Sequence, residues 1–149
     1  MKIRKKVVQL VQTYDTNNPF EIASLEKIHV IFEELGQIRG YYHEIFAVKI
    51  IHINSVLDDT EQTRVCAHEL GHSLLHESQN SPYMYSHTLY PLGKYEKEAD
   101  KFMIQLLIPD SLLFEYHHLT LPQLSALWGY PITLLEYRLS TFSPDKICS

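Results

Sequence analysis

Residues 68–72 read His68-Glu69-Leu70-Gly71-His72, and this stretch decides how the rest of the chain is interpreted. On an α-helix the two histidines lie about 40° apart around the axis and about 6 Å apart along it. One tetrahedral zinc ion can therefore take a nitrogen from each ring. Glu69 lies about 100° from His68 around the same helix, so we expect its carboxylate to stand beside the metal. There it could take a proton from a water molecule.

The surrounding residues favour a helix from Asp58 to Glu77. Asp59 is a suitable N-cap, and Gln62 three residues later completes a capping-box pattern. The apolar face of this helix would consist of Val65, Cys66, Leu70 and Leu74. The β-branched residues of 50–56 predict a strand just before it. A strand that leads into a helix with H-E-x-x-H is the order of elements in zinc peptidases of the zincin type.

Length and composition limit the class of protein. The chain has 149 residues, of which 45% are hydrophobic, enough for one domain with a real core. The net charge of −5 argues against nucleic acid as a direct ligand, and nothing in the sequence points to a particular oligomeric state. No apolar stretch approaches 18 residues and no secretory signal is recognisable, so we expect no membrane association. Two cysteines do not suggest a disulfide framework, and the cytoplasm is the expected compartment.

Periodicity and turn residues predict the order of the elements. Helices are expected over residues 3–14, 19–27, 58–77, 95–107, 110–117, 121–128 and 132–139. Extended segments over 30–35, 37–46 and 48–53 suggest a small, mostly antiparallel sheet. Residues 78–94, rich in Ser, Tyr and Pro, are expected to form a long loop. We therefore predict an α+β fold: a mostly helical, zincin-like domain of residues 1–118 with a three-stranded sheet against the motif helix, and a short helical C-terminal extension of residues 119–149 that packs on it.

Two histidines leave zinc in need of a third protein ligand, with one position open for water. A third histidine six residues after the second is excluded, because Ser78 stands at that position. His76 continues the spacing of the motif, but it lies about 80° from His68 and a further turn along the helix. We interpret His76 as an outer or surface histidine. The remaining source is a carboxylate from the helix predicted over residues 95–107.

That helix offers two candidates, Glu96 and Glu98, which lie about 200° apart around its axis, so both cannot readily bind one metal. We favour Glu96, because Asp100 shares its helix face. Asp100 would then accept the other N–H of a ligating histidine and fix its tautomer. Glu98 remains open as the ligand. It also remains open that neither glutamate binds a metal, and that both are simply charged residues of the first turn that the helix dipole stabilises.

Two segments together resemble the ImmA/IrrE family of bacterial and phage metallopeptidases. Residues 68–76 read H-E-L-G-H-S-L-L-H, and residues 96–109 read E-K-E-A-D-K-F-M-I-Q-L-L-I-P. The upstream I-I-H-I-N-S of residues 50–55 fits the family as well, and the resemblance covers roughly residues 19–140. It implies a gluzincin-like fold, a cytoplasmic protease, His68, His72 and Glu96 as metal ligands, and Glu69 as the catalytic residue. Met103 stands where the family usually has Ala, a departure that concerns packing.

The residues and the resemblance together predict a zinc-dependent endopeptidase. Glu69 would take the proton of the attacking water and return it to the leaving amine. A further donor to the oxyanion would come from the loop, with Tyr83, Tyr85, His87 and Tyr90 as candidates.

Family members commonly act on a helix-turn-helix repressor of a prophage or integrative element, and the resemblance implies such a substrate here, whose cleavage relieves repression. Segments 121–128 and 132–139 themselves have helix-turn-helix spacing. The second holds one Arg and no Lys, which favours packing on the peptidase body over phosphate binding. The alternative function is a metal-stabilised binding module that sequesters a regulator or DNA without cutting it.

Overall fold

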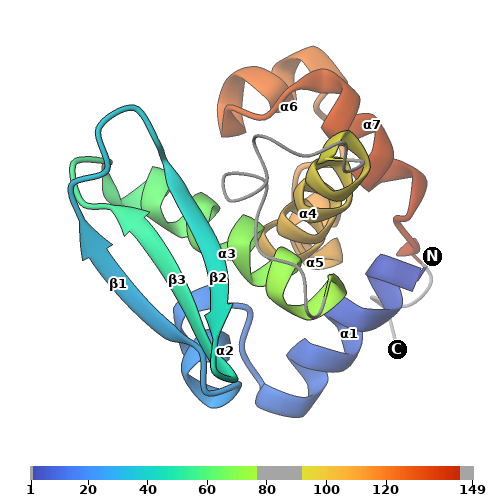
Figure 1. The fold of residues 1–149 in the computed structure, drawn as a ribbon. Helices are drawn as coiled ribbons and strands as arrows, with labels where there is room; N and C mark the ends of the chain where they lie inside the picture. The colour runs from blue at the N-terminus through green and yellow to red at the C-terminus, as the bar shows by residue number, and fades with distance from the viewer. Residues whose placement is uncertain (1, 77–91, 145–149) are drawn as a thin grey trace.

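The computed structural model describes residues 2–76 and 92–144, which combine a small sheet with several helices (Figure 1). The elements are α1 (Lys2–Tyr14), α2 (Pro19–Leu25), β1 (His29–Glu33), β2 (Gly40–Ile45), β3 (Val48–Asn54), α3 (Asp59–Leu75), α4 (Leu92–Leu107), α5 (Asp110–Glu115), α6 (Leu121–Trp128) and α7 (Ile132–Ser140). The predicted α+β class is confirmed, and each predicted boundary lies within three residues of the observed one. Residues 92–94 of the predicted loop are helical, and the rest of that loop lies outside the described residues.

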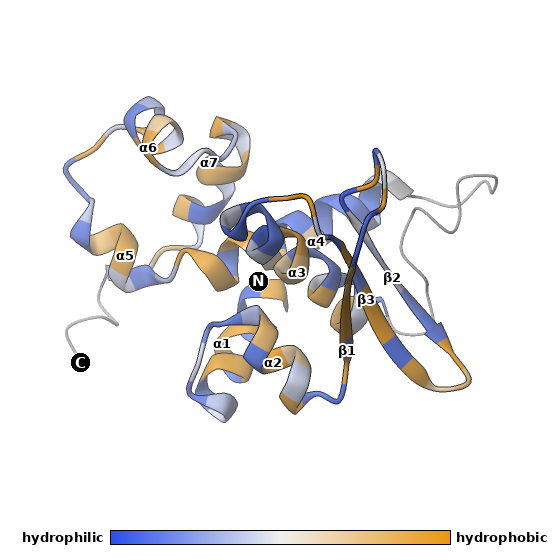
Figure 2. Cartoon of the chain, turned by 90° about the vertical axis from the view of Figure 1, so that its left-hand side faces the viewer, coloured by the Kyte–Doolittle hydropathy of each residue, from blue (hydrophilic) through white to orange (hydrophobic). Residues whose placement is uncertain are grey.

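The sheet is mixed, with the strand order β1-β3-β2. β2 and β3 form an antiparallel hairpin, whereas β1 and β3 pair in parallel. The expectation of a mostly antiparallel sheet is therefore wrong for one of the two pairings. β3 takes the central position because it is the most buried strand, with Ile51 and Ile53 fully enclosed. Both β1 and β3 are predominantly hydrophobic (Figure 2).

The N-cap of the motif helix α3 lies one residue before the predicted cap. Asp58, not Asp59, is the N-cap: its backbone is extended, and its side chain accepts a hydrogen bond of 2.8 Å from the backbone N–H of Glu61. Asp59 instead lies in the first helical turn, where an acidic side chain interacts favourably with the helix dipole. Gln62 takes no part in the cap and donates to the carbonyl of Ser55, at 3.4 Å.

Helix α3 packs against the sheet on one side and against α4 on the other (Figure 1). At the α3–α4 contact, a Cβ atom on Gly71 would lie 3.0 Å from Cβ of Phe102, so only a glycine allows this approach without a shift. Leu70 and Phe102 are fully buried between the layers. α4 ends just before Pro109, as predicted. This close contact sets the distance between side chains on the two helices.

The C-terminal helices join the same core. Thr120 and Gln123 form a capping box at the start of α6, and Gly129 in the left-handed region ends it. Leu124 and Leu135 are buried with the rest of the core, and α7 packs on α4. The one Arg of α7, Arg138, is 1% exposed, so it is turned inward rather than toward a ligand. None of the described helices is long and apolar enough to cross a bilayer.

Candidate active site

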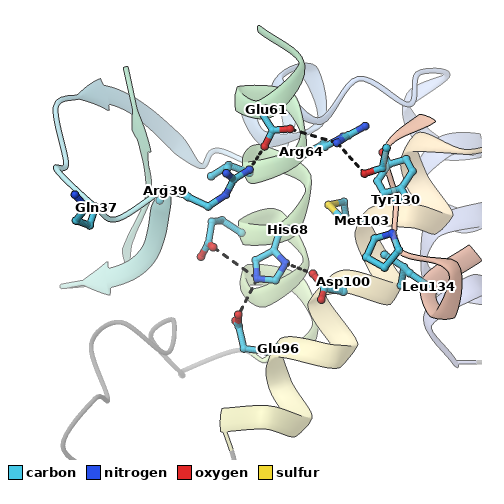
Figure 3. Close-up of a pocket in the computed structure, with 15 residues that line it drawn as sticks. Gln37, Arg39, Glu61, Arg64, His68, Glu96, Asp100, Met103, Tyr130 and Leu134 are labelled. Atoms are coloured by element: carbon cyan, nitrogen blue, oxygen red, sulfur yellow. Dashed lines mark hydrogen bonds and ion pairs between the residues drawn. The ribbon is translucent and has the colours of Figure 1, made fainter. Parts of the chain in front are cut away.

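The two motif histidines meet a glutamate from the neighbouring helix. Nε2 of His68 lies 3.1 Å from Oε1 of Glu96, and Nε2 of His72 lies 2.7 Å from the same oxygen. α3 contributes both rings from adjacent turns of one face, and α4 contributes the carboxylate. Figure 3 shows His68 between Glu96 and Asp100. The structure therefore brings together all three side chains that the sequence pointed to as metal ligands.

The outer nitrogens of the two rings face different partners. Nδ1 of His68 lies 2.8 Å from a carboxylate oxygen of Asp100, which is the contact expected from the shared face of Glu96 and Asp100. Nδ1 of His72 lies 3.1 Å from Nδ1 of His76. Each ring thus presents Nε2 to Glu96 and holds its other nitrogen in a hydrogen bond.

Glu98 lies beside the third histidine, His76. Its Oε2 is 3.5 Å from Nε2 of His76, so it faces that ring. His76 is buried, as an outer histidine would be, and its ring packs 4.4 Å from the ring of Tyr95. Of the two candidate glutamates, the geometry favours Glu96 as the ligand.

Glu69 is buried next to the two motif rings. Its Oε2 lies 3.8 Å from Nε2 of His68, and the backbone N–H of Tyr42 in β2 donates to its carboxylate. Its Oε1 has no hydrogen-bond partner within residues 2–76 and 92–144. Ligand atoms of His68, Glu69 and His72 all lie within 4.8 Å of one another. A buried carboxylate with one free oxygen therefore stands beside the converging nitrogens.

The ionisation of these groups reflects an excess of negative charge. Burial lowers the pKa of His68, but hydrogen bonds to Asp100 and Glu96 outweigh it and raise the pKa to about 10. Burial works to raise the pKa of Glu96, yet the hydrogen bonds and charges of the two rings hold it well below its usual range. Burial raises the pKa of Glu69, and the nearby histidines oppose this only in part.

These residues fit a divalent cation. Three carboxylates around two imidazoles call for positive charge, and two ring nitrogens with one carboxylate oxygen are the donor set of catalytic zinc sites. The hydrogen bond from His68 to Asp100 also matches the outer contact by which ligating histidines are held.

A cleft of about 620 Å³ leads away from the site. It begins at His68, Glu69 and Glu96 and runs between the start of β2 and the α6–α7 turn. At its far end, Arg39 and Arg64 both pair with Glu61 (Figure 3). An apolar wall faces this charged group and consists of Met103, Tyr130, Pro131 and Leu134.

Arg64 on α3 contacts the wall of the cleft at Trp128 and Tyr130. It donates to the carbonyl of Trp128, and its guanidinium stacks 4.3 Å from the centre of the Tyr130 ring. Sequence reasoning missed Arg39, Arg64, Tyr42 and Tyr130, because no motif marks them and only tertiary packing brings them to the site. The four oxyanion-donor candidates, Tyr83, Tyr85, His87 and Tyr90, lie outside the described residues.

A helix that carries H-E-x-x-H is typical of metallopeptidases. The chain belongs to the ImmA/IrrE family of metallopeptidases. The family model described as the IrrE N-terminal-like domain matches residues 23–140. The resemblance drawn from the two sequence motifs is thereby confirmed.

Two relatives cover nearly the whole chain. Uncharacterized immunity region protein 2 of Bacillus phage phi105 is 41% identical over 139 residues, which is 91% of this chain and 88% of that protein. Metallopeptidase ImmA of Bacillus subtilis (strain 168) is 32% identical over 144 residues, 93% of this chain and 84% of that protein.

Proposed function

We propose that this protein is a zinc-dependent endopeptidase that cuts a protein substrate. The observation that carries the proposal is the convergence of His68 Nε2 and His72 Nε2 on Glu96 Oε1, at 3.1 and 2.7 Å. This donor set leaves a fourth position of a tetrahedral ion open for water or substrate. Membership of a metallopeptidase family supports the same conclusion.

The proposed chemistry assigns proton transfer to Glu69. A divalent ion held by His68, His72 and Glu96 would polarise the scissile carbonyl and lower the pKa of a water molecule. Glu69 takes a proton from that water as its oxygen attacks the carbonyl carbon. It returns the proton to the amine nitrogen as the C–N bond breaks. Burial raises the pKa of Glu69, which makes it a better base than an exposed carboxylate.

The cleft supports a peptide substrate. Its apolar wall of Met103, Tyr130 and Leu134 suits an apolar side chain of an extended segment, and Arg39 at the far end carries an exposed positive charge. We further propose that the substrate is a helix-turn-helix repressor and that its cleavage relieves phage or mobile-element immunity. The printed name of the phage phi105 relative, an immunity region protein, supports this setting.

The test is Glu69→Gln, which keeps the size of the side chain and removes its basicity. Wild-type or variant protein is co-expressed with a candidate helix-turn-helix repressor from the same phage or mobile element, and the repressor is followed by mass spectrometry. We expect two fragments with wild type and an intact regulator with the variant, while the zinc content of both proteins stays the same. Fragments produced equally by both would contradict the proposal. Equal derepression without fragments would favour the binding module.

A further inference from the structure

We infer that His76 and Glu98 form a hydrogen-bond relay that orients His72 toward the metal site. This inference rests on the metal site of the proposed function and adds two positioning residues to it. The relay would run from His72 Nδ1 to His76 Nδ1 and from His76 Nε2 to Glu98, parallel to the direct contact between His68 and Asp100. The two motif histidines are thus held by different means.

The proton positions follow once a metal ion is bound. The ion would take the lone pair of His72 Nε2, the nitrogen that faces Glu96, so that Nδ1 carries the proton. Nδ1 of His76 lies 3.1 Å away and must therefore accept. A neutral imidazole that accepts at Nδ1 carries its own proton at Nε2. Coordination at one end of the relay thus fixes the tautomer of the next ring.

Glu98 completes the relay. Nε2 of His76 is buried, and no residue in the described part of the chain accepts a hydrogen bond from it. Oε2 of Glu98, however, stands 3.5 Å away, slightly beyond normal hydrogen-bond length. Because a buried N–H without an acceptor is unfavourable, we expect this distance to shorten once the tautomer of His76 is fixed.

The end of α3 places His76 for this role. His76 is the C-cap residue of α3, and its backbone N–H donates to the carbonyl of His72 at 2.9 Å. The ring of Tyr95 packs against the imidazole from the α4 side, at 4.4 Å between centroids. Glu98 keeps 29% of its side chain exposed, so the relay leads from the buried ring to the surface. The residues of α4 that contact His68 and His72 are Glu96 and Asp100, which lie about one helical turn apart.

The experiment compares two substitutions of similar size. In His76→Asn the amide oxygen can take the place of Nδ1 and accept from His72, whereas His76→Leu has no acceptor. Zinc affinity is measured by competition with a chromophoric chelator, and the visible spectrum of the Co²⁺ form reports the coordination geometry. We expect His76→Leu to lose about 10- to 100-fold in affinity and to alter the Co²⁺ spectrum. His76→Asn should retain most of the affinity.

A matched control is His118→Leu, the same change at an exposed histidine in the turn after α5. It should leave zinc affinity unchanged. Thermal unfolding of the metal-free proteins separates loss of packing from loss of metal binding. Glu98→Ala should lower the affinity less than His76→Leu and add nothing to it in the double variant, because both remove the same relay.

The outcomes separate the inference from the function on which it rests. Wild type that binds no zinc would overturn both the metal site and the relay. Wild type that binds zinc while His76→Leu binds equally well would overturn only the relay. A loss as large in His76→Asn as in His76→Leu would also overturn it, because the accepting atom would then be irrelevant.

Discussion

Glu96 and Glu98 stand two positions apart on α4, and they face different histidines at the end of α3. Residues two positions apart on a helix differ by about 200° around its axis, so the two acidic side chains contact different partners. Glu96 meets the Nε2 atoms of His68 and His72, and Glu98 meets His76. At the scale of single residues, the proposed division between a metal ligand, Glu96, and an outer residue, Glu98, therefore follows from their angle around the helix axis.

This division predicts unequal effects of two identical substitutions. Glu96→Ala removes the carboxylate that both rings face, so zinc affinity should fall by more than the roughly 100-fold upper range of outer-contact changes. Glu98→Ala, the matched control, should cost far less. Zinc competition titrations of both variants measure the difference. A larger loss for Glu98→Ala would reverse the assignment of the ligand.

The part of the site that the sequence revealed is the part that lies within single helices. His68, Glu69 and His72 share one helix, and Glu96 and Asp100 share another, so their relative directions follow from the angle per residue. Tyr42 and Arg39 reach the site only because β2 lies beside α3, and no spacing in the sequence encodes that approach. The interaction of His76 with Glu98 joins two helices and was likewise not predicted; the spacing of the motif predicted only an outer or surface position for His76.

At the scale of elements, the site depends on how closely α3 approaches α4. Gly71 lies next to His72, and a Cβ there would stand 3.0 Å from Cβ of Phe102. Because that atom is attached directly to the backbone of α4, the side chain cannot rotate away. A side chain at this position would require α4 to move by a few tenths of an ångström, and Glu96 with it.

We therefore expect Gly71→Ala to push the two helices apart. The free energy of unfolding should fall by about 1–3 kcal/mol, the usual range for overpacking, and zinc affinity should fall with it. Urea denaturation of the metal-free protein and zinc titration provide the two measurements. Gly93→Ala is the control, because nothing lies within 4 Å of its added Cβ. It should be neutral or stabilise α4 by up to about 1 kcal/mol, and an equal loss in both variants would argue against the close contact.

The positions of the strands could be predicted from the sequence, but their order in the sheet could not. Alternation and β-branched residues located all three strands, since these properties are local. Strand order depends on which strand is buried on both sides, and β3 takes the centre, with β1 paired to it in parallel. The hairpin of β2 and β3 was compatible with either arrangement, so the parallel pairing of β1 was missed.

At the scale of the whole molecule, one carboxylate connects three helices. Asp110 at the start of α5 pairs with Arg4 of α1 at 2.6 Å and with Arg138 of α7 at 2.5 Å. Arg138 also donates to the carbonyl of Ile108 and is almost fully buried. This group joins the N-terminal helix to the C-terminal pair. The division into a domain of residues 1–118 and an extension of 119–149 stays a prediction.

Removal of this carboxylate should destabilise the whole chain. Asp110→Asn leaves the buried Arg138 without its counter-charge, so we expect a loss of about 3 kcal/mol at pH 7. Burial alone would raise the pKa of Asp110, but hydrogen bonds from Arg4 and Arg138 hold it below its usual range.

The pH dependence of stability gives a second measurement on the same variant. Because the folded-state pKa of Asp110 is the lower one, its contribution is complete above the unfolded pKa of about 3.9 and is lost as the pH falls through the folded value. The difference between wild type and Asp110→Asn should therefore narrow below about pH 4. Glu115→Gln, an exposed carboxylate on the same helix, should show no such narrowing, and a constant difference at all pH values would contradict the expectation.

The hydrogen bond from the amide of Tyr42 to Glu69 has a consequence for how this protein can be studied. The donor belongs to the main chain, so every one of the twenty amino acids except proline would supply it at position 42. An exhaustive substitution library would consequently report that position 42 matters for packing alone. Only chemical synthesis with an ester in place of that amide would reveal the contribution of the strand to the proposed proton transfer.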